Sequence, residues 1–274
     1  MRPALSTLGC PGWDLERICA GGSDAGFEGV DFRGYRDELD VTRHPLFTER
    51  ADATRDRLAD TGLTVCCLSS SIALADADHR EETLSEARRL VSVAEDFGVD
   101  RVRVFGGGAD SDASTAALAR AAGETVRDVL AVDGAEGLQW LVETHDVWTG
   151  SRDCLTLLDE LPAANTGLVW DVAHTVRLAD ESPVATLDAL GDRIEHVHLK
   201  DAAPAPDHPD ATADGYVYVL PGVGEIPVAD AVRELDARGY DGWAVFEHEK
   251  RWHPSLADPA EAFPAFVDWF RSVE

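Results

Sequence analysis

The stretch RIEHVHLKDA, residues 193–202, places His196, His198 and Lys200 at alternate positions and Asp201 directly after them. Alternate side chains of a β-strand lie on the same face of its sheet. We therefore expect these three side chains to point the same way, either into solvent or into the wall of a site. Which of the two applies depends on the kind of sheet that the strand joins.

Short runs of this kind recur along the chain, each with the length and the β-branched or aromatic content of a strand. Between them lie stretches with helical spacing, such as 80–98, whose apolar residues form one stripe and whose Gly98 is a typical helix stop. Strands that alternate with such helices pair in parallel through right-handed crossovers, and eight such units close into a barrel. The strand-like runs are 4–9, 29–34, 64–71, 101–107, 138–146, 167–174, 194–201 and 243–249.

The predicted fold is therefore α/β, a (β/α)8 TIM barrel that forms a single domain over residues 1–274. An open, doubly wound sheet is the competitor, but no GxGxxG pattern follows the first strand. No linker or low-complexity segment divides the chain. The Pro-, Ala- and Asp-rich segment 201–215 sits in the seventh unit, and we expect residues 201–224 to form a loop long enough to cover a site.

The composition is strongly acidic, with 52 Asp and Glu against 24 Lys and Arg and a formal net charge of −28. Such a charge repels polyanions, which argues against a nucleic acid or an anionic membrane as partner. Only two of the basic residues are lysines, a composition similar to that of proteins from halophilic organisms. Five cysteines without CxxC spacing, no apolar leader and no bilayer-length apolar run predict a cytoplasmic protein that acts on a small molecule.

Polar side chains gather at the carboxyl ends of the predicted strands, which is the end of a parallel barrel where sites lie. Apolar residues precede them on the same strand, for example Val169 and Trp170 before Asp171. Both faces of a barrel strand are covered, so carboxylates there must be paired or bound to a metal. Strands five to eight together offer three carboxylates and one imidazole, a set that suits Mn, Mg, Co or Zn. These residues are Glu143, Asp171, His198 and Glu247.

The chain resembles a known family in the order and separation of its short motifs. They run from STLGCPGWDL and GFEGVDFRG through GLVWDVAH, HVHLKD and LPGVGEI to GYDGWAVFEHE. In these it is similar to the xylose-isomerase-like TIM barrels. That family includes sugar and sugar-phosphate isomerases and epimerases, inosose and dehydroshikimate dehydratases, and a branch of abasic-site endonucleases.

The resemblance implies that Glu143, Asp171, His198 and Glu247 bind one divalent metal ion. It also implies catalytic roles for Glu143 and Glu247 on opposite sides of the substrate. One would remove a proton beside a carbonyl and the other would return it, through an enediolate that the metal stabilises. Other polar strand-end residues would contact the substrate or support the ligands. These substrate-binding candidates are His174, Lys200, Arg33, His145 and Glu249.

Two further polar residues and two glycine-rich segments complete the expectations. We expect His196 to be structural, because it lies deeper along its strand, and Asp31 either to orient Arg33 or only to end its strand. The segment LPGVGEIP, residues 220–227, lacks the GxxxxGK[ST] pattern of a phosphate loop, so we expect a structural turn. The segment FGGGADSD, residues 105–112, suits backbone contact to a substrate and a plain loop equally well.

The leading hypothesis is a divalent-metal-dependent isomerase or epimerase of a small sugar, sugar phosphate or cyclitol. Family members are often dimers or tetramers, so the resemblance also implies a homo-oligomer. The alternative is a metal-dependent dehydratase, an inosose- or dehydroshikimate-type lyase, which needs the same metal and one base. The acidic charge disfavours an abasic-site endonuclease, and a barrel that binds a ligand without turnover stays open. Lys200 and Asp201 stand where sugar epimerases tend toward Gly-Glu, which puts free ketohexoses in doubt.

Overall fold

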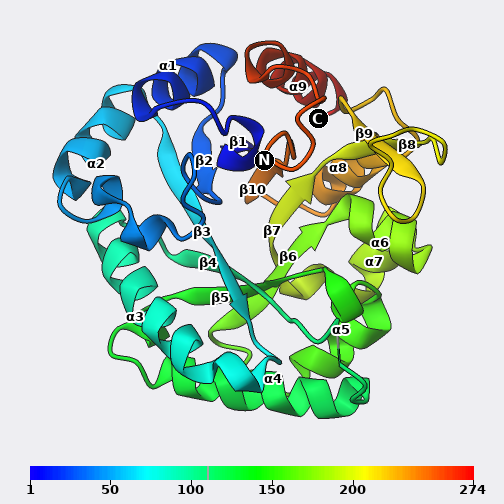
Figure 1. Ribbon diagram of the computed structural model, residues 1–274. Coiled ribbons are helices and arrows are strands. Elements are labelled where there is room, and N and C mark those ends of the chain that lie inside the picture. Colours follow the sequence, from blue (N-terminus) through cyan, green and yellow to red (C-terminus); the bar gives the residue numbers. More distant parts are fainter. Residues whose placement is uncertain (110) are drawn as a thin grey trace.

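Eight parallel strands close into a barrel in the computed structural model, which describes residues 1–109 and 111–274 (Figure 1). Around the barrel the strands follow the order β1, β10, β7, β6, β5, β4, β3, β2, and β2 pairs with β1 to close the ring. The predicted (β/α)8 fold is thus confirmed. The barrel strands are β1 (Arg2–Ser6), β2 (Gly29–Phe32), β3 (Thr64–Ala73), β4 (Arg101–Phe105), β5 (Gln139–Glu143), β6 (Thr166–Asp171), β7 (Ile194–Leu199) and β10 (Trp243–Phe246).

Helices surround the barrel and connect its successive strands (Figure 1). The stop predicted at Gly98 is confirmed, because this residue adopts the left-handed conformation, with φ 65°, directly after α3. The helix that follows β4 ends at Leu130, and Gly134 then turns the chain with φ 84°. The helices are α1 (Leu15–Ala25), α2 (Ala51–Asp60), α3 (Arg80–Phe97), α4 (Thr115–Leu130), α5 (Ser151–Leu158), α6 (Val172–Ala179), α7 (Pro183–Leu190), α8 (Val228–Ala237) and α9 (Pro259–Val273).

The apolar core has a large outer part and a small inner part. In the outer part, between strands and helices, Phe266 of α9 stacks on Phe246 of β10 with ring centroids 4.5 Å apart. Burying a side chain of this size contributes about 1.5–3 kcal/mol. In the inner part, Trp243 and Val245 of β10 alternate with Glu247, the residue after the strand, so they share the face that Glu247 occupies at the carboxyl end. Apolar packing therefore fills the barrel below its polar strand ends.

The segment 201–224, expected to be one long loop, instead forms an antiparallel hairpin outside the ring of barrel strands (Figure 1). Its strands are β8 (Asp201–Pro204) and β9 (Tyr216–Val219). The Asp201 carboxylate accepts hydrogen bonds from four backbone N–H groups, those of residues 202, 222, 224 and 226. A Cβ at Gly224 would meet Asp201 Oδ1 at 2.3 Å, so only glycine fits there. Residues 220–227 therefore form the predicted structural turn, and Asp201 holds it against the barrel.

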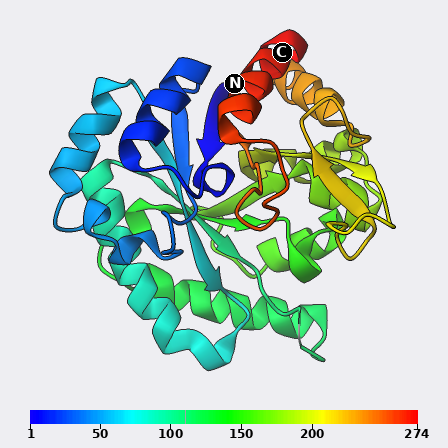
Figure 2. The same cartoon turned by 45° about the horizontal axis from the view of Figure 1, so that its top comes forward.

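The two ends of the described chain meet at the amino-terminal side of the barrel (Figure 2). The amino group of Met1 lies 2.6 Å from Glu274 Oε1, which follows α9. Among the described residues, none of the helices combines the length and the hydropathy that a bilayer-spanning segment needs.

Candidate active site

Four side chains from neighbouring strands meet at the carboxyl end of the barrel. Glu143 ends β5, Asp171 ends β6, His198 lies next to the last residue of β7, and Glu247 follows β10. The strand registers pair His198 with Asp171 on one side and with Val245 on the other. One ligand atom of each of the four residues lies within 4.8 Å of every other, and all four are buried. We call these four residues the ligand cluster.

The donor set of the ligand cluster fits a divalent cation. Glu143 Oε2, Asp171 Oδ2 and His198 Nδ1 are buried and have charged neighbours, but they make no hydrogen bond of good geometry among the described residues. Buried polar atoms without such partners are costly. Carboxylate oxygens and one imidazole are the ligands that Mn, Mg, Co and Zn accept. The cluster is therefore a candidate metal site.

Lys200, expected to meet the substrate, also contacts the ligand cluster. Its Nζ atom lies 2.8 Å from both Asp171 Oδ2 and Glu247 Oε2, and 2.5 Å from Glu249 Oε1. Burial favours the neutral amine, but these carboxylates raise the pKa of Lys200 well above its ordinary value. In the metal-free protein, the Lys200 ammonium thus neutralises part of the negative charge of the ligand cluster.

Arg103 is a site residue that the sequence reasoning missed. It lies within β4, is 1% exposed, and places Nε 3.2 Å from Glu143 Oε2. Its Nη1 donates a hydrogen bond to the Ser70 carbonyl oxygen, and its guanidinium lies 4.1 Å from the centre of the Phe105 ring. The signal was present in RVRVF, residues 101–105, because an arginine inside a strand covered on both faces needs a partner.

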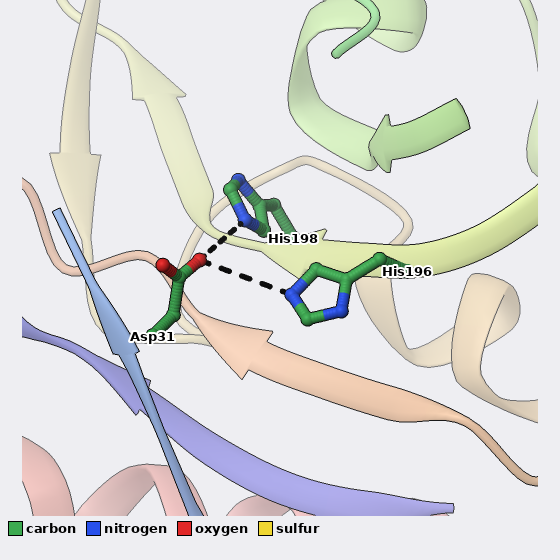
Figure 3. A group of neighbouring side chains, drawn as sticks. All are labelled: Asp31, His196 and His198. Carbon is green, nitrogen blue, oxygen red and sulfur yellow. Dashed lines mark hydrogen bonds and ion pairs between the residues drawn. The ribbon is translucent and has the colours of Figure 1, made fainter. Parts of the chain in front are cut away.

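A second group of buried side chains lies on the other side of the His198 ring (Figure 3). Asp31 Oδ2 accepts a hydrogen bond from His198 Nε2 at 3.2 Å and lies 3.8 Å from His196 Nε2. Burial alone would raise the pKa of the Asp31 carboxyl, but the two histidines hold it below its ordinary value. The register of β2 shifts between Val30 and Asp31, an irregularity of the kind that re-aims a side chain.

These contacts decide how His198 faces the ligand cluster. A carboxylate only accepts hydrogen bonds, so Nε2 of His198 carries the proton and Nδ1 lies toward Glu247, with Oε1 at 3.3 Å. Asp31 therefore holds His198 and does not orient Arg33, with which it shares no ion pair or hydrogen bond among the described residues. His196 lies deeper along the strand, as expected, and is completely buried.

The D-x-x-H spacing of Asp171 and His174 has a local cause. Asp171 Oδ1 accepts the backbone N–H of His174 at 3.0 Å and caps α6, which leaves Oδ2 to face the cluster. Nδ1 of His174 donates to the carbonyl oxygen of Thr144 at 3.0 Å, so Nε2 keeps its lone pair. Burial first, and then the charge of Lys200, lowers the pKa of His174 to about 3, which makes this imidazole neutral.

One pocket at the mouth of the barrel brings the predicted site residues together. His145 Nδ1 lies 2.8 Å from Asp146 Oδ1, and its ring centroid lies 4.9 Å from that of His174. The glycine-rich segment 105–112 contributes Phe105, whereas Asp110 of that segment lies outside the described residues. All five substrate-binding candidates and both glutamates line this pocket. The lining residues are Leu8, Arg33, Arg103, Phe105, Glu143, His145, His174, Lys200, Glu247, Glu249 and Trp252.

Comparison with known proteins adds a family and several relatives. The model of the xylose isomerase-like TIM barrel family matches residues 21–273. An inosose dehydratase of Lacticaseibacillus casei is 33% identical over 142 residues, which cover 47% of this chain and 44% of that protein. The chain thus spans less than half the length of the curated relatives that it matches.

Solved structures show the same fold at low sequence identity. The probable 3-DHS dehydratase AsbF of Bacillus anthracis superposes with a TM-score of 0.81, at 18% identity, over 99% of both chains. The IOLI protein with a bound zinc atom superposes with a TM-score of 0.80, at 15% identity, over 100% of this chain and 98% of that one.

Proposed function

The chain belongs to the xylose isomerase-like TIM barrel family, and we propose that within it the protein is a metal-dependent dehydratase. Its substrate would be a cyclic polyhydroxylated ketone, as for an inosose- or dehydroshikimate-type lyase. The likeness to inosose dehydratases supports this choice. The proposal replaces the isomerase or epimerase favoured from the sequence with its alternative.

The state of Glu247 carries the proposal. An epimerase of the expected kind needs two glutamates that are free to take and return a proton on opposite sides of the substrate. Here Glu247 Oε2 lies 2.8 Å from the Lys200 ammonium, and Oε1 lies 3.3 Å from His198 Nδ1. A carboxylate held by a cation is a weaker base. Loss of water needs only one group that takes a proton from the substrate and returns it to the leaving hydroxyl, and the pocket offers His145 beside Asp146 for this role.

When bound, a divalent cation in the ligand cluster supplies Lewis-acid polarisation of the substrate carbonyl. His145 Nε2 would take the proton from the carbon next to that carbonyl, because Asp146 lies beside Nδ1 and, against the effect of burial, raises the pKa of this ring above its ordinary value. The resulting imidazolium would then give that proton to the hydroxyl group on the following carbon. The carbon–oxygen bond then breaks, water leaves, and a double bond conjugated to the carbonyl remains. Glu143, next to Arg103, would act in this scheme as a ligand.

Ultraviolet absorbance of the product tests the proposal directly. Protein loaded with Mn²⁺ or Co²⁺ is incubated with an inosose and with 3-dehydroshikimate, and the absorbance of the conjugated product is followed. We expect absorbance to grow with at least one of the two substrates and to stop when a chelator removes the metal. An epimerised ring, detected by NMR without an absorbing product, would replace the dehydratase with an epimerase.

A pair of histidine variants tests the assigned acceptor. We expect His145→Gln to lower kcat by at least about 100-fold, since a positioned general base contributes about that much. His208→Gln is the matched control, because His208 is an exposed histidine of the hairpin loop. Equal rates for the two variants would remove His145 from the scheme.

A further inference from the structure

Arg33 is a buried cation at the pocket with no carboxylate beside it in the part of the chain that the structure describes. The residue directly follows β2, is 9% exposed and lines the pocket. Its Nη1 donates a hydrogen bond to Ser71 Oγ at 2.9 Å, and its backbone N–H donates to Thr7 Oγ1. None of the ion pairs among the described residues includes its guanidinium. A charge removed from water without a counter-charge is costly.

The other two cations of the pocket, unlike Arg33, have carboxylate partners. Lys200 contacts three carboxylates, and Arg103 lies 3.2 Å from Glu143. Arg103 and Arg33 also lie near the same Phe105 ring, at 4.1 and 5.8 Å from its centre. Burial, and next the charge of Arg103, lowers the pKa of Arg33 to about 10. The surroundings thus disfavour the charge of Arg33, and an anion beside it would offset that cost.

The position of Arg33 separates it from the ligand cluster. The cluster comes from β5, β6, β7 and β10, whereas Arg33 follows β2, which lies between β1 and β3 on the other part of the ring. A ring-shaped substrate with its carbonyl at the cluster would therefore turn a different substituent toward Arg33. The net charge of −28 repels anions from the molecule as a whole. To bind an anionic substrate, a protein with this net charge needs a cation inside the pocket.

We propose that Arg33 binds a carboxylate substituent of the substrate, so that the protein acts on a carboxylated polyhydroxy ring in preference to a neutral one. The planar guanidinium offers parallel N–H donors that match the two oxygens of a carboxylate. Ser71 fixes one edge of the guanidinium and leaves the remaining donors for the ligand. The ring and its carbonyl rest on the proposed function, whereas the binding of an anion at Arg33 does not.

Calorimetric binding of unreactive rings to the full chain, with Mn²⁺ present, tests the proposal. The probes are quinate, a carboxylated polyhydroxy ring, and myo-inositol, a neutral one. We expect wild-type protein to bind quinate at least about tenfold tighter than myo-inositol, as one good charged hydrogen-bonded contact allows. Arg33→Met should abolish that preference and leave the affinity for myo-inositol within about twofold. Arg33→Lys, which keeps the charge but not the paired donors, should retain part of it.

Arg36→Met is the matched control, because it removes the same charge from an exposed position three residues away, with 53% of the side chain exposed. Arg36→Met should leave the affinities for quinate and for myo-inositol unchanged. This result would show that a direct contact with Arg33, and not the net charge of the protein, causes the preference. No preference for quinate in the wild type, or a preference that survives Arg33→Met, would overturn the proposal. Tighter binding of myo-inositol 1-phosphate than of quinate would also overturn it, in favour of a phosphate.

The dehydratase assay separates this proposal from the proposed function. A quinate preference that depends on Arg33, with no absorbing product from any ring ketone, would leave the carboxylate contact standing and remove the dehydratase. Dehydration of an inosose at the same kcat/KM as 3-dehydroshikimate would leave the dehydratase standing and remove the preference for a carboxylated ring.

Discussion

The two sides of the His198 ring carry different buried groups, and the difference shows what each is built for. On the Nδ1 side lie the three carboxylates of the ligand cluster, two of which contact the Lys200 ammonium, and negative charge is in excess. On the Nε2 side, the single carboxylate of Asp31 is shared by two imidazoles (Figure 3). The first arrangement can take up a cation. The second can hold an imidazole in one orientation.

Replacing a ligand on the Nδ1 side should have the largest effect. Asp171→Asn keeps a good helix cap for α6 but removes a charged oxygen from the cluster. We expect the affinity for Mn²⁺ or Zn²⁺ to fall by at least about 100-fold, because a lost ligand costs more than a lost supporting contact. Calorimetry of the wild type and the variant measures the change. An unchanged affinity would mean that the cation binds elsewhere.

Replacing the carboxylate on the Nε2 side should have a smaller effect in the same direction. Asp31→Asn leaves His198 in place but removes the charge that fixes its Nε2 proton. We expect metal affinity to fall by about 10- to 100-fold, the usual cost of losing such a contact. Long-range proton–nitrogen NMR of the histidine rings in metal-free protein gives a second readout. Burial lowers the pKa of His198, but Glu247 and Asp31 raise it well above its ordinary value, so both ring nitrogens of the wild type should be protonated at neutral pH, whereas the variant should lose a ring proton at a lower pH. An unchanged titration of His198 in the variant would contradict this role.

Removing the internal cation should act in the opposite direction. Lys200→Met takes a positive charge from beside Asp171 and Glu247. We expect metal affinity to rise by about tenfold, because a nearby ammonium repels an incoming cation. The metal-free variant should also unfold more easily, by about 3–5 kcal/mol, since its buried carboxylates lose their partner. Thermal unfolding with and without metal measures both effects, and weaker metal binding would show that Lys200 supports the site.

The smallest effect is expected from His196, which shares Asp31 but lies away from the ligand cluster. Its Nε2 is 3.8 Å from Asp31 Oδ2, compared with 3.2 Å for His198. We expect His196→Gln to change metal affinity by less than about threefold. A loss of tenfold or more, or a second equivalent of metal in the wild type, would make Asp31, His196 and His198 a cation site of their own.

The barrel and the members of the ligand cluster could be predicted because both follow from periodicity. Strands that alternate with helices close into a barrel, and polar residues at strand ends then share one rim. The contacts of Lys200 could not be predicted in the same way. The sequence placed its side chain at the mouth, but a flexible chain can meet a substrate or a neighbouring carboxylate equally well. The structure shows the carboxylates.

Other features depend on contacts between residues far apart in the sequence. The contact of Asp31 with His198 joins positions 167 residues apart, and the register shift beside Asp31 has no signature in GVDF, residues 29–32. The hairpin of residues 201–219 was expected as a loop because its Pro and Asp content suggests one. What organises it is Asp201, whose partners lie up to 25 residues further on.

The Asp201 carboxylate has a consequence for how a barrel of this kind can acquire new substrate specificities. Asp201 ties the two ends of the hairpin together, so the segment between residues 204 and 216 can change length at little entropic cost. The hairpin also carries Tyr218, whose ring centre lies 5.4 Å from Lys200 Nζ. It is therefore an exchangeable module: a different hairpin grafted onto the same aspartate would alter the wall beside Lys200 without touching the eight strands that hold the site.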